Sequence, residues 1–141
     1  MRLDFLTLAD KAEAINGKLY MMGGGVGGIG LIQLPGPAAV DVAIGLMVDY
    51  AETSDTHQLQ LSLETADNTP VIGPITIPFA TGRPPGLPAG EAVRFIAVLQ
   101  GPFPIPGEGR YHWVAQVGDV RFPPTIFQVI KMTPLVAQPP G

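Results

Sequence analysis

Prolines and glycines are spaced so closely along this chain that few segments are long enough to form a helix of several turns. Sixteen prolines and eighteen glycines separate short runs in which apolar and polar residues alternate. Proline interrupts helices and glycine favours turns, so this spacing is typical of an all-β domain with many tight turns. The cleanest run places Leu59, Leu61 and Leu63 on one phase and polar residues on the other, as expected of a strand with one buried face.

Similar runs predict an all-β fold with about seven to nine strands. They lie at residues 3–8, 19–22, 29–34, 40–48, 58–64, 71–79, 93–99, 111–117 and 125–131. An antiparallel sandwich of two sheets, immunoglobulin-like or jelly-roll-like, buries this many one-faced strands. We expect one sandwich domain at residues 1–134 and a flexible Pro/Gly tail at 135–141. The prolines within 71–79 place that strand at a sheet edge.

The inward phases of these strands define the expected core, with Trp113 as its largest member. The core residues are Phe5, Leu19, Val42, Ile44, Leu46, Leu59, Leu61, Leu63, Val93, Phe95, Leu99, Tyr111, Trp113, Phe127 and Val129. At 141 residues the chain is long enough to bury such a core without disulfides or metal ions.

The segment after the first strand has two interpretations. Asp10 followed by Glu13 resembles a helix start and allows a single helical turn at residues 9–14. Asn16-Gly17 is the strongest short signal for a hairpin, because both turn positions need positive φ. We prefer the hairpin, because apolar residues continue directly after it.

Charge and cysteine content exclude several classes of function. The net charge is −4 and the eight basic residues are spread along the chain, so neither nucleic acid nor an anionic membrane surface is an expected partner. The chain has no cysteine, which excludes disulfides and thiolate ligands. The first residues lack the apolar core of an export signal, and no run is long enough to span a bilayer, so we expect a cytoplasmic protein.

The sequence around residues 23–30 matches the glycine spacing of a dinucleotide-binding loop. That loop works by opening a helix whose N-terminus holds the pyrophosphate. Residues 31–35 are too short and too β-like for such a helix, and the lysine of a phosphate-binding loop is missing. We therefore interpret the glycines as a structural turn and predict no cofactor.

Candidate catalytic groups are sparse, and we predict that the chain is not an enzyme. His57 and His112 are the only histidines, and a metal or catalytic site would require both to meet a carboxylate. We interpret them as surface residues, and Asp41 as an outward-facing solubilising group. Neither Ser54 nor Ser62 lies in a Gly-x-Ser-x-Gly elbow. We predict no catalytic, cofactor-binding or metal-ligating residues.

Apolar residues exceed what one core needs. Only 14% of residues are charged, and several strands are apolar on both phases. The outward phase contributes an expected interaction surface formed by Met47, Ile96, Val98, Val114 and Ile130. Either the loops at 78–90 and 101–108 fold across this surface, or a protein partner covers it.

The leading hypothesis is therefore a non-catalytic interaction or assembly module. Its partner is a protein, in the first place a second copy in a homo-oligomer. The alternative is a domain that binds a small molecule or carbohydrate near the glycine-rich loop, with Tyr20 and Trp113 lining the site.

Two segments resemble known proteins. The opening resembles a family of small bacterial proteins of unknown function, which implies a sandwich but no activity. The residues that carry this resemblance are Asp4-Phe5, Ala9-Asp10, Ala12-Glu13, Asn16-Gly17-Lys18-Leu19-Tyr20 and Gly23-Gly24-Gly25. The second segment, Gly109-Arg110-Tyr111, is similar to a late strand of immunoglobulin-like sandwiches, in which the tyrosine hydroxyl bonds the backbone at a corner.

Overall fold

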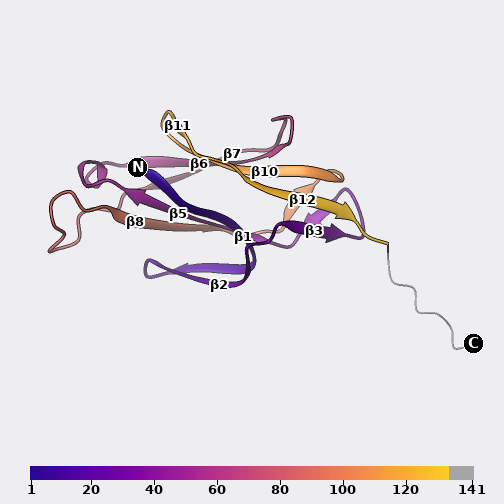
Figure 1. Cartoon of the computed structure of the whole chain (residues 1–141), viewed down its shortest axis with the longest axis horizontal. Coiled ribbons are helices and arrows are strands. Elements are labelled where there is room, and N and C mark those ends of the chain that lie inside the picture. The colour runs from indigo at the N-terminus through magenta and orange to yellow at the C-terminus, as the bar shows by residue number, and fades with distance from the viewer. Residues whose placement is uncertain (134–141) are drawn as a thin grey trace, which may run out of the picture.

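Two sheets face each other across an apolar core (Figure 1). The computed structural model describes residues 1–133. Sheet A has the order β2 (Lys18–Gly24), β1 (Arg2–Ile15), β5 (Asp41–Val48), β8 (Val93–Leu99). Sheet B has the order β3 (Gly28–Leu31), β12 (Thr125–Lys131), β10 (Gly109–Val117), β6 (His57–Thr65), β7 (Pro70–Phe79). Neighbouring strands are antiparallel except β3 and β12, which pair in parallel. The predicted all-β sandwich is confirmed.

Three short strands and one helical turn complete the fold. They are β4 (Gly36–Ala38), which pairs with β9 (Phe103–Ile105), β11 (Val120–Arg121), which pairs with β10, and the 3-10 turn η1 (Tyr50–Glu52). The sequence did not predict β4, β9 or β11, because runs of two or three residues show no period. The predicted tail at 135–141 lies outside the described residues.

The hairpin interpretation of the first turn is correct. Asn16 and Gly17 have φ values of 51° and 74°, the positive pair that a type I′ turn requires. Ile15 pairs with Lys18 across this turn. The alternative helical turn at residues 9–14 is wrong, because β1 continues through that segment to Ile15.

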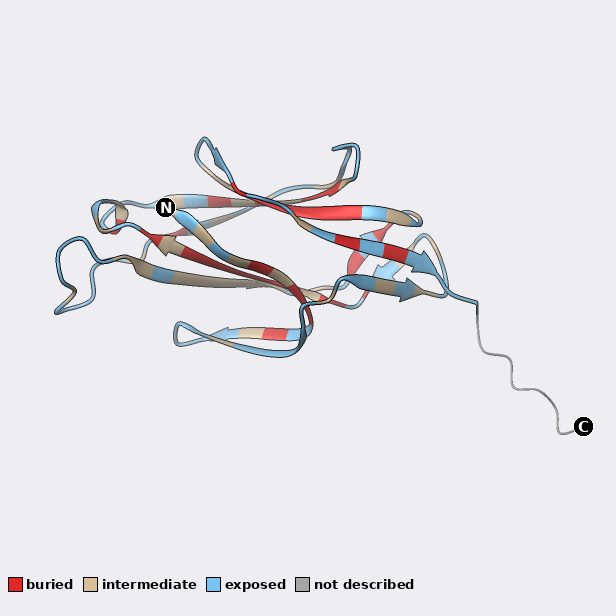
Figure 2. Ribbon diagram, in the orientation of Figure 1, coloured by how far each residue is buried: buried red, intermediate tan, exposed pale blue. Residues whose placement is uncertain are grey.

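The core lies between the inward phases of the two sheets (Figure 2). Trp113 is 1% exposed and meets the Phe103 ring edge-on at 5.0 Å. Five expected core residues are only half-buried, because they lie on the edge strand β8 or on the outer side of sheet A. These residues are Phe5, Leu19, Val93, Phe95 and Leu99.

Tyr111 forms the corner that its sequence context predicts. Its hydroxyl donates a 2.6 Å hydrogen bond to the Gly107 carbonyl, while its ring stacks on Phe127 at 5.8 Å. The side chain is 3% exposed. This contact ties the start of β10 to the preceding loop.

Strand β1 serves two partners in succession. Its first half pairs with β5, from Arg2 to Ala9, and its second half pairs with β2. The β1–β2 hairpin lies on the outer side of sheet A, away from sheet B (Figure 1). There, Ala9, Ala12 and Ala43 are buried in a second apolar cluster. The partly buried members of that cluster are Phe5, Leu19 and Val98.

Small residues and one carboxylate hold the hairpin against the sheet. A Cβ at Gly45 would collide with the Phe5 ring, so glycine is required for Phe5 to lie across β5. Asp41 accepts hydrogen bonds from the backbone N–H of Ala12 and of Gly101, each 2.9 Å long. The interpretation of Asp41 as a solubilising group is therefore wrong, since its carboxylate joins β5 to the hairpin and to the segment after β8.

We expect Trp113→Ala to lower the free energy of unfolding by about 3–5 kcal/mol, because it removes buried apolar surface and leaves a cavity. Urea denaturation monitored by circular dichroism measures this loss. Ile126→Ala is the matched control, because Ile126 is 55% exposed on the neighbouring strand, and we expect a change within about 0.5 kcal/mol. Equal midpoints for Trp113→Ala and the wild type would contradict the inward phase of β10.

We expect Asp41→Ala to lower the free energy of unfolding by roughly 2–4 kcal/mol, because it leaves two backbone N–H groups without their charged acceptor. Hydrogen exchange at the Ala12 amide should accelerate more than exchange in the centre of β6. Asp55→Ala, in the exposed turn after η1, is the control and should change stability by less than about 0.5 kcal/mol. Unchanged protection of Ala12 in Asp41→Ala would show that the hairpin is held by other contacts.

Candidate interaction surface

The structure divides the predicted surface residues between the two sheets. Met47 on β5 and Ile96 and Val98 on β8 are half-buried, and β5 and β8 are neighbours in sheet A. Ile130 lies on β12 of sheet B and is 52% exposed. Val114 is 3% exposed on β10, between β6 and β12, so it is not accessible to a partner. The five residues therefore do not form one continuous surface.

The β1–β2 hairpin covers the outer face of sheet A, a role that the sequence did not predict. Leu19 of the hairpin belongs to the same apolar cluster as Phe5 and Val98. Met47 and Ile96 are not members of that cluster. The hairpin therefore covers only part of this face.

The loops at 78–90 and 101–108, which the sequence offered as covers of this face, take other positions. Arg83, in the loop before β8, stacks its guanidinium 3.9 Å from the centre of the Tyr50 ring and donates a 3.0 Å hydrogen bond to the Tyr50 carbonyl. The same guanidinium donates a 2.9 Å hydrogen bond to the buried hydroxyl of Thr53. This loop is anchored at η1. The segment at 101–108 contains β9, which pairs with β4.

The hairpin itself exposes a cluster of large apolar side chains. We call Ile15, Tyr20, Met21 and Met22 the hairpin patch; each is more than 40% exposed, and Met22 reaches 72%. Tyr20 is paired with Glu13 and Met22 with Lys11. Since directly paired residues share a face, the apolar side chains of Tyr20 and Met22 lie beside one acidic and one basic group.

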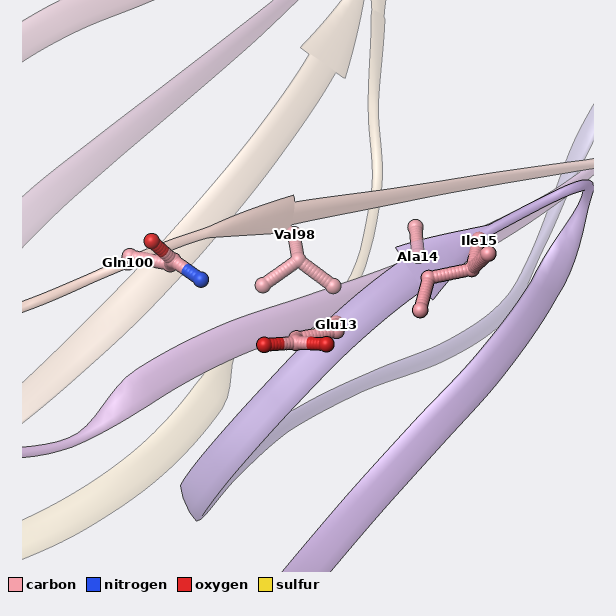
Figure 3. A pocket seen from close by; sticks show the side chains of 5 residues that line it. All are labelled: Glu13, Ala14, Ile15, Val98 and Gln100. Carbon is pink, nitrogen blue, oxygen red and sulfur yellow. The ribbon is translucent and has the colours of Figure 1, made fainter.

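A cleft separates the hairpin from β8 (Figure 3). Its volume is about 400 Å³, and the lining residues are Glu13, Ala14, Ile15, Val98 and Gln100. The Glu13, Val98 and Gln100 side chains point into this space (Figure 3). Glu13 supplies the only carboxylate of the lining and Gln100 adds an amide, so the cleft is a mixed polar and apolar space with one negative charge.

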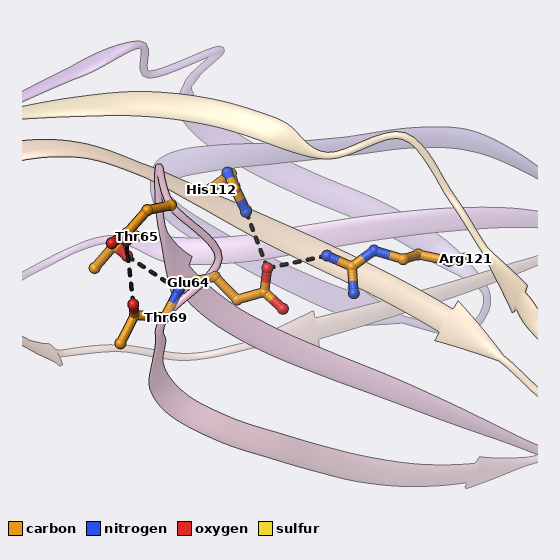
Figure 4. A network of polar contacts seen from close by, with 6 residues as sticks. Glu64, Thr65, Thr69, His112 and Arg121 are labelled. Carbon is orange, nitrogen blue, oxygen red and sulfur yellow. Dashed lines mark hydrogen bonds and ion pairs between the residues drawn. The ribbon is translucent and has the colours of Figure 1, made fainter.

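Sheet B carries a polar network that joins β6, β10 and β11 (Figure 4). His112 Nε2 and Glu64 Oε2 lie 3.0 Å apart, and Arg121 Nη2 donates to the same oxygen at 2.9 Å. Both His112 and Glu64 are 9% exposed, so the interpretation of His112 as a surface residue is wrong. The alternating pattern of β10 predicts that the His112 side chain points away from the core. It does not predict that the Glu64 carboxylate covers that side chain.

The electrostatics of Glu64 follow from these contacts. Burial alone would raise the pKa of the Glu64 carboxyl, but the hydrogen bonds from His112 and Arg121 outweigh that effect, and the pKa is lowered from its ordinary value of 4.5. The carboxylate is therefore held in its ionised form. The network stabilises charge and offers no activated nucleophile.

The two histidines do not meet. In the β6–β10 ladder, His112 lies opposite Glu64, seven residues along β6 from His57, a separation of about 23 Å at the usual rise of a strand. The His57 ring instead contacts the Glu52 carbonyl at 2.8 Å. Within residues 1–133, no group of three or more His, Asp or Glu side chains is arranged to hold a metal ion.

The glycine-rich segment forms a turn. Gly25 has a φ of 78°, and its N–H donates to the Thr7 hydroxyl at 3.2 Å. The chain then enters β3, so this loop does not open a helix. The ligand-binding alternative receives little support here, because Trp113 lies in the core and the cleft beside Tyr20 has a volume of about 150 Å³, below the range of most ligand pockets.

The comparisons with known proteins agree with the resemblance seen at the N-terminus. The chain belongs to a family of unknown function (DUF6941), whose model matches residues 4–130. It matches no curated protein and no solved structure. In the described part of the chain, no helix is long and apolar enough to cross a membrane.

We expect the ion pairs of Glu64 with His112 and Arg121 to stabilise the fold at pH values above the ordinary pKa of a glutamate. This stabilisation should be lost in acid. Because the pKa of Glu64 is lowered in the folded state, the stabilisation is complete above pH 4.5 and declines as the pH falls through the folded pKa. At pH 7, Glu64→Gln should be less stable than the wild type by about 1 kcal/mol.

Urea midpoints between pH 7 and pH 2 test this expectation. The difference between the wild type and Glu64→Gln should shrink towards the acid end. Glu91→Gln, at an exposed position, controls for the loss of one negative charge. A difference that stays constant over this pH range would contradict the assigned role of Glu64.

Proposed function

We propose that this member of a family of unknown function is a non-catalytic interaction module that self-associates through the outer side of sheet A. The observation that carries the proposal is the hairpin patch. Four large apolar side chains are exposed on one hairpin, and by the strand register Ile15, Tyr20 and Met22 belong to the same face. Exposed apolar patches usually mark protein interaction sites.

The residue types of the patch also suit a protein interface. Two of its four members are methionines, whose flexible side chains adapt to irregular surfaces. Tyrosine is enriched at interfaces because it combines a large apolar ring with a polar tip. The patch adjoins the cleft, because Ile15 belongs to both.

Low charge on β5 and β8 further supports an interface on this side. Their only ionised side chains are Asp41, which accepts two backbone hydrogen bonds, and Arg94, whose Nε lies 3.0 Å from the Asp4 carboxylate. Few free charges would need to lose water when another surface docks here. The half-buried Met47, Ile96 and Val98 would then lose their remaining exposure.

We expect the wild type to show a mass above the monomer in light scattering at high concentration. The double variant Tyr20→Ser/Met22→Ser should dissociate, because losing about 2 kcal/mol of apolar burial raises the dissociation constant about 30-fold. Dilution series monitored by light scattering give both constants.

The matched control for this variant is Val120→Ser/Ile126→Ser. Both positions are at least half exposed, and both lie on strands attached to sheet B. This control should associate like the wild type. A wild type that stays monomeric at several hundred times the concentration used for the other assays would overturn self-association.

A further inference from the structure

We infer that the second copy docks by strand pairing: the free edge of β8 pairs antiparallel with β8 of another copy, extending sheet A across a two-fold axis. This inference rests on the proposed function: it names the partner and adds an edge contact beside the cleft that Val98 shares with Ile15 of the hairpin patch. Among the described residues, β8 ends sheet A and pairs only with β5.

The edge strands β8 of sheet A and β7 of sheet B differ in how they are protected against pairing with a strand of another molecule. On sheet B, the edge strand β7 carries Pro70, Pro74 and Pro78, and proline blocks the addition of another strand. On sheet A, β8 has the sequence Val-Arg-Phe-Ile-Ala-Val-Leu, without proline or glycine. Its register with β5 is continuous from Val93 to Leu99, so no bulge distorts the edge.

Charge does not protect the β8 edge either. Arg94 is its only ionised residue, and Asp4 of the same chain partly neutralises it at 3.0 Å. Lysines and inward-pointing charges are the usual devices that prevent edge-to-edge pairing. An apolar, regular strand of seven residues therefore offers an uninterrupted row of backbone donors and acceptors.

One register uses the whole strand. Antiparallel pairing that overlaps all residues from Val93 to Leu99 places Ile96 opposite Ile96 of the second copy. Any antiparallel edge is self-complementary under such a two-fold axis. A register centred on Arg94 would instead place two arginines opposite each other, which is unfavourable.

This register is also complementary in charge. It places Arg94 of each copy opposite Val98 of the other, and directly paired side chains share a face. Val98 lines the cleft together with Glu13. The guanidinium of one copy therefore approaches the carboxylate in the cleft of the other copy, and the contact occurs twice.

Cysteine crosslinking tests the register directly, because the natural chain contains no cysteine. Ile96→Cys should form covalent dimers with a short bifunctional thiol reagent, since directly opposed residues lie about 4.5–5.5 Å apart. Arg94→Cys or Val98→Cys alone should not crosslink, because each is offset from its own copy by four residues, about 13 Å. A mixture of Arg94→Cys and Val98→Cys should crosslink to a mixed dimer.

The charge contact gives an independent measurement. Glu13→Arg and Arg94→Glu should each raise the dimer dissociation constant roughly two- to fivefold, as expected for a partly exposed ion pair. The double variant should regain most of the wild-type affinity. Circular dichroism of each variant checks that the fold is retained.

The outcomes separate this inference from the proposed function. Association that depends on the hairpin patch, without the Ile96 crosslink or with crosslinking at Arg94 alone, would overturn β8 pairing and leave the interaction module standing. A wild type that is monomeric throughout would overturn both.

Discussion

The arrangement of sheet A depends on the Asp41 carboxylate. One oxygen binds the Ala12 amide in the hairpin, and the other binds the Gly101 amide just after β8. Because Asp41 begins β5, between β1 and β8 in the sheet, one side chain couples the point where β1 leaves β5 to the end of the edge strand. An ionised acceptor forms stronger hydrogen bonds than a neutral one, so the carboxylate fixes the hairpin where a peptide carbonyl would hold it less firmly.

The outward-facing residues of β5 form the surface on which the β1–β2 hairpin packs. Ala43 is small enough for Ala9 and Ala12 to pack against it, and Gly45 leaves room for the Phe5 ring. Apolar residues on both phases of this strand therefore do not all indicate a missing partner, because the chain supplies a third layer itself. The outward residues that stay half-buried are Met47 on β5 and Ile96 and Val98 on β8, and together with the hairpin patch they form the surface left to a partner.

The sequence predicted the strands and turns that are determined by residues close together in the chain. Period-two patterns located 93–99 and 125–131 with the bounds of β8 and β12, and Asn16-Gly17 identified the type I′ turn. The placement of the hairpin on sheet A, the burial of His112 by Glu64 and the dual role of Asp41 were not predictable in this way. Each depends on residues at least 29 positions apart in the chain, which no local pattern reports.

The cost of removing water from charged groups determines which edge strand, β7 or β8, is better suited to pair with a second copy. A docking strand removes water from every ionised group that it covers, and that cost is recovered only when each charge finds a partner. On sheet B, Glu64 is already committed to His112 and Arg121, and the β7 edge lacks three amide donors because of its prolines. Strand β8 contains no proline, so all its backbone N–H groups are present. Its one charged residue, Arg94, already lies beside Asp4, and in the proposed dimer Glu13 in the cleft of the other copy supplies a second carboxylate. Pairing at β8 therefore gains backbone hydrogen bonds while leaving no charge without a partner.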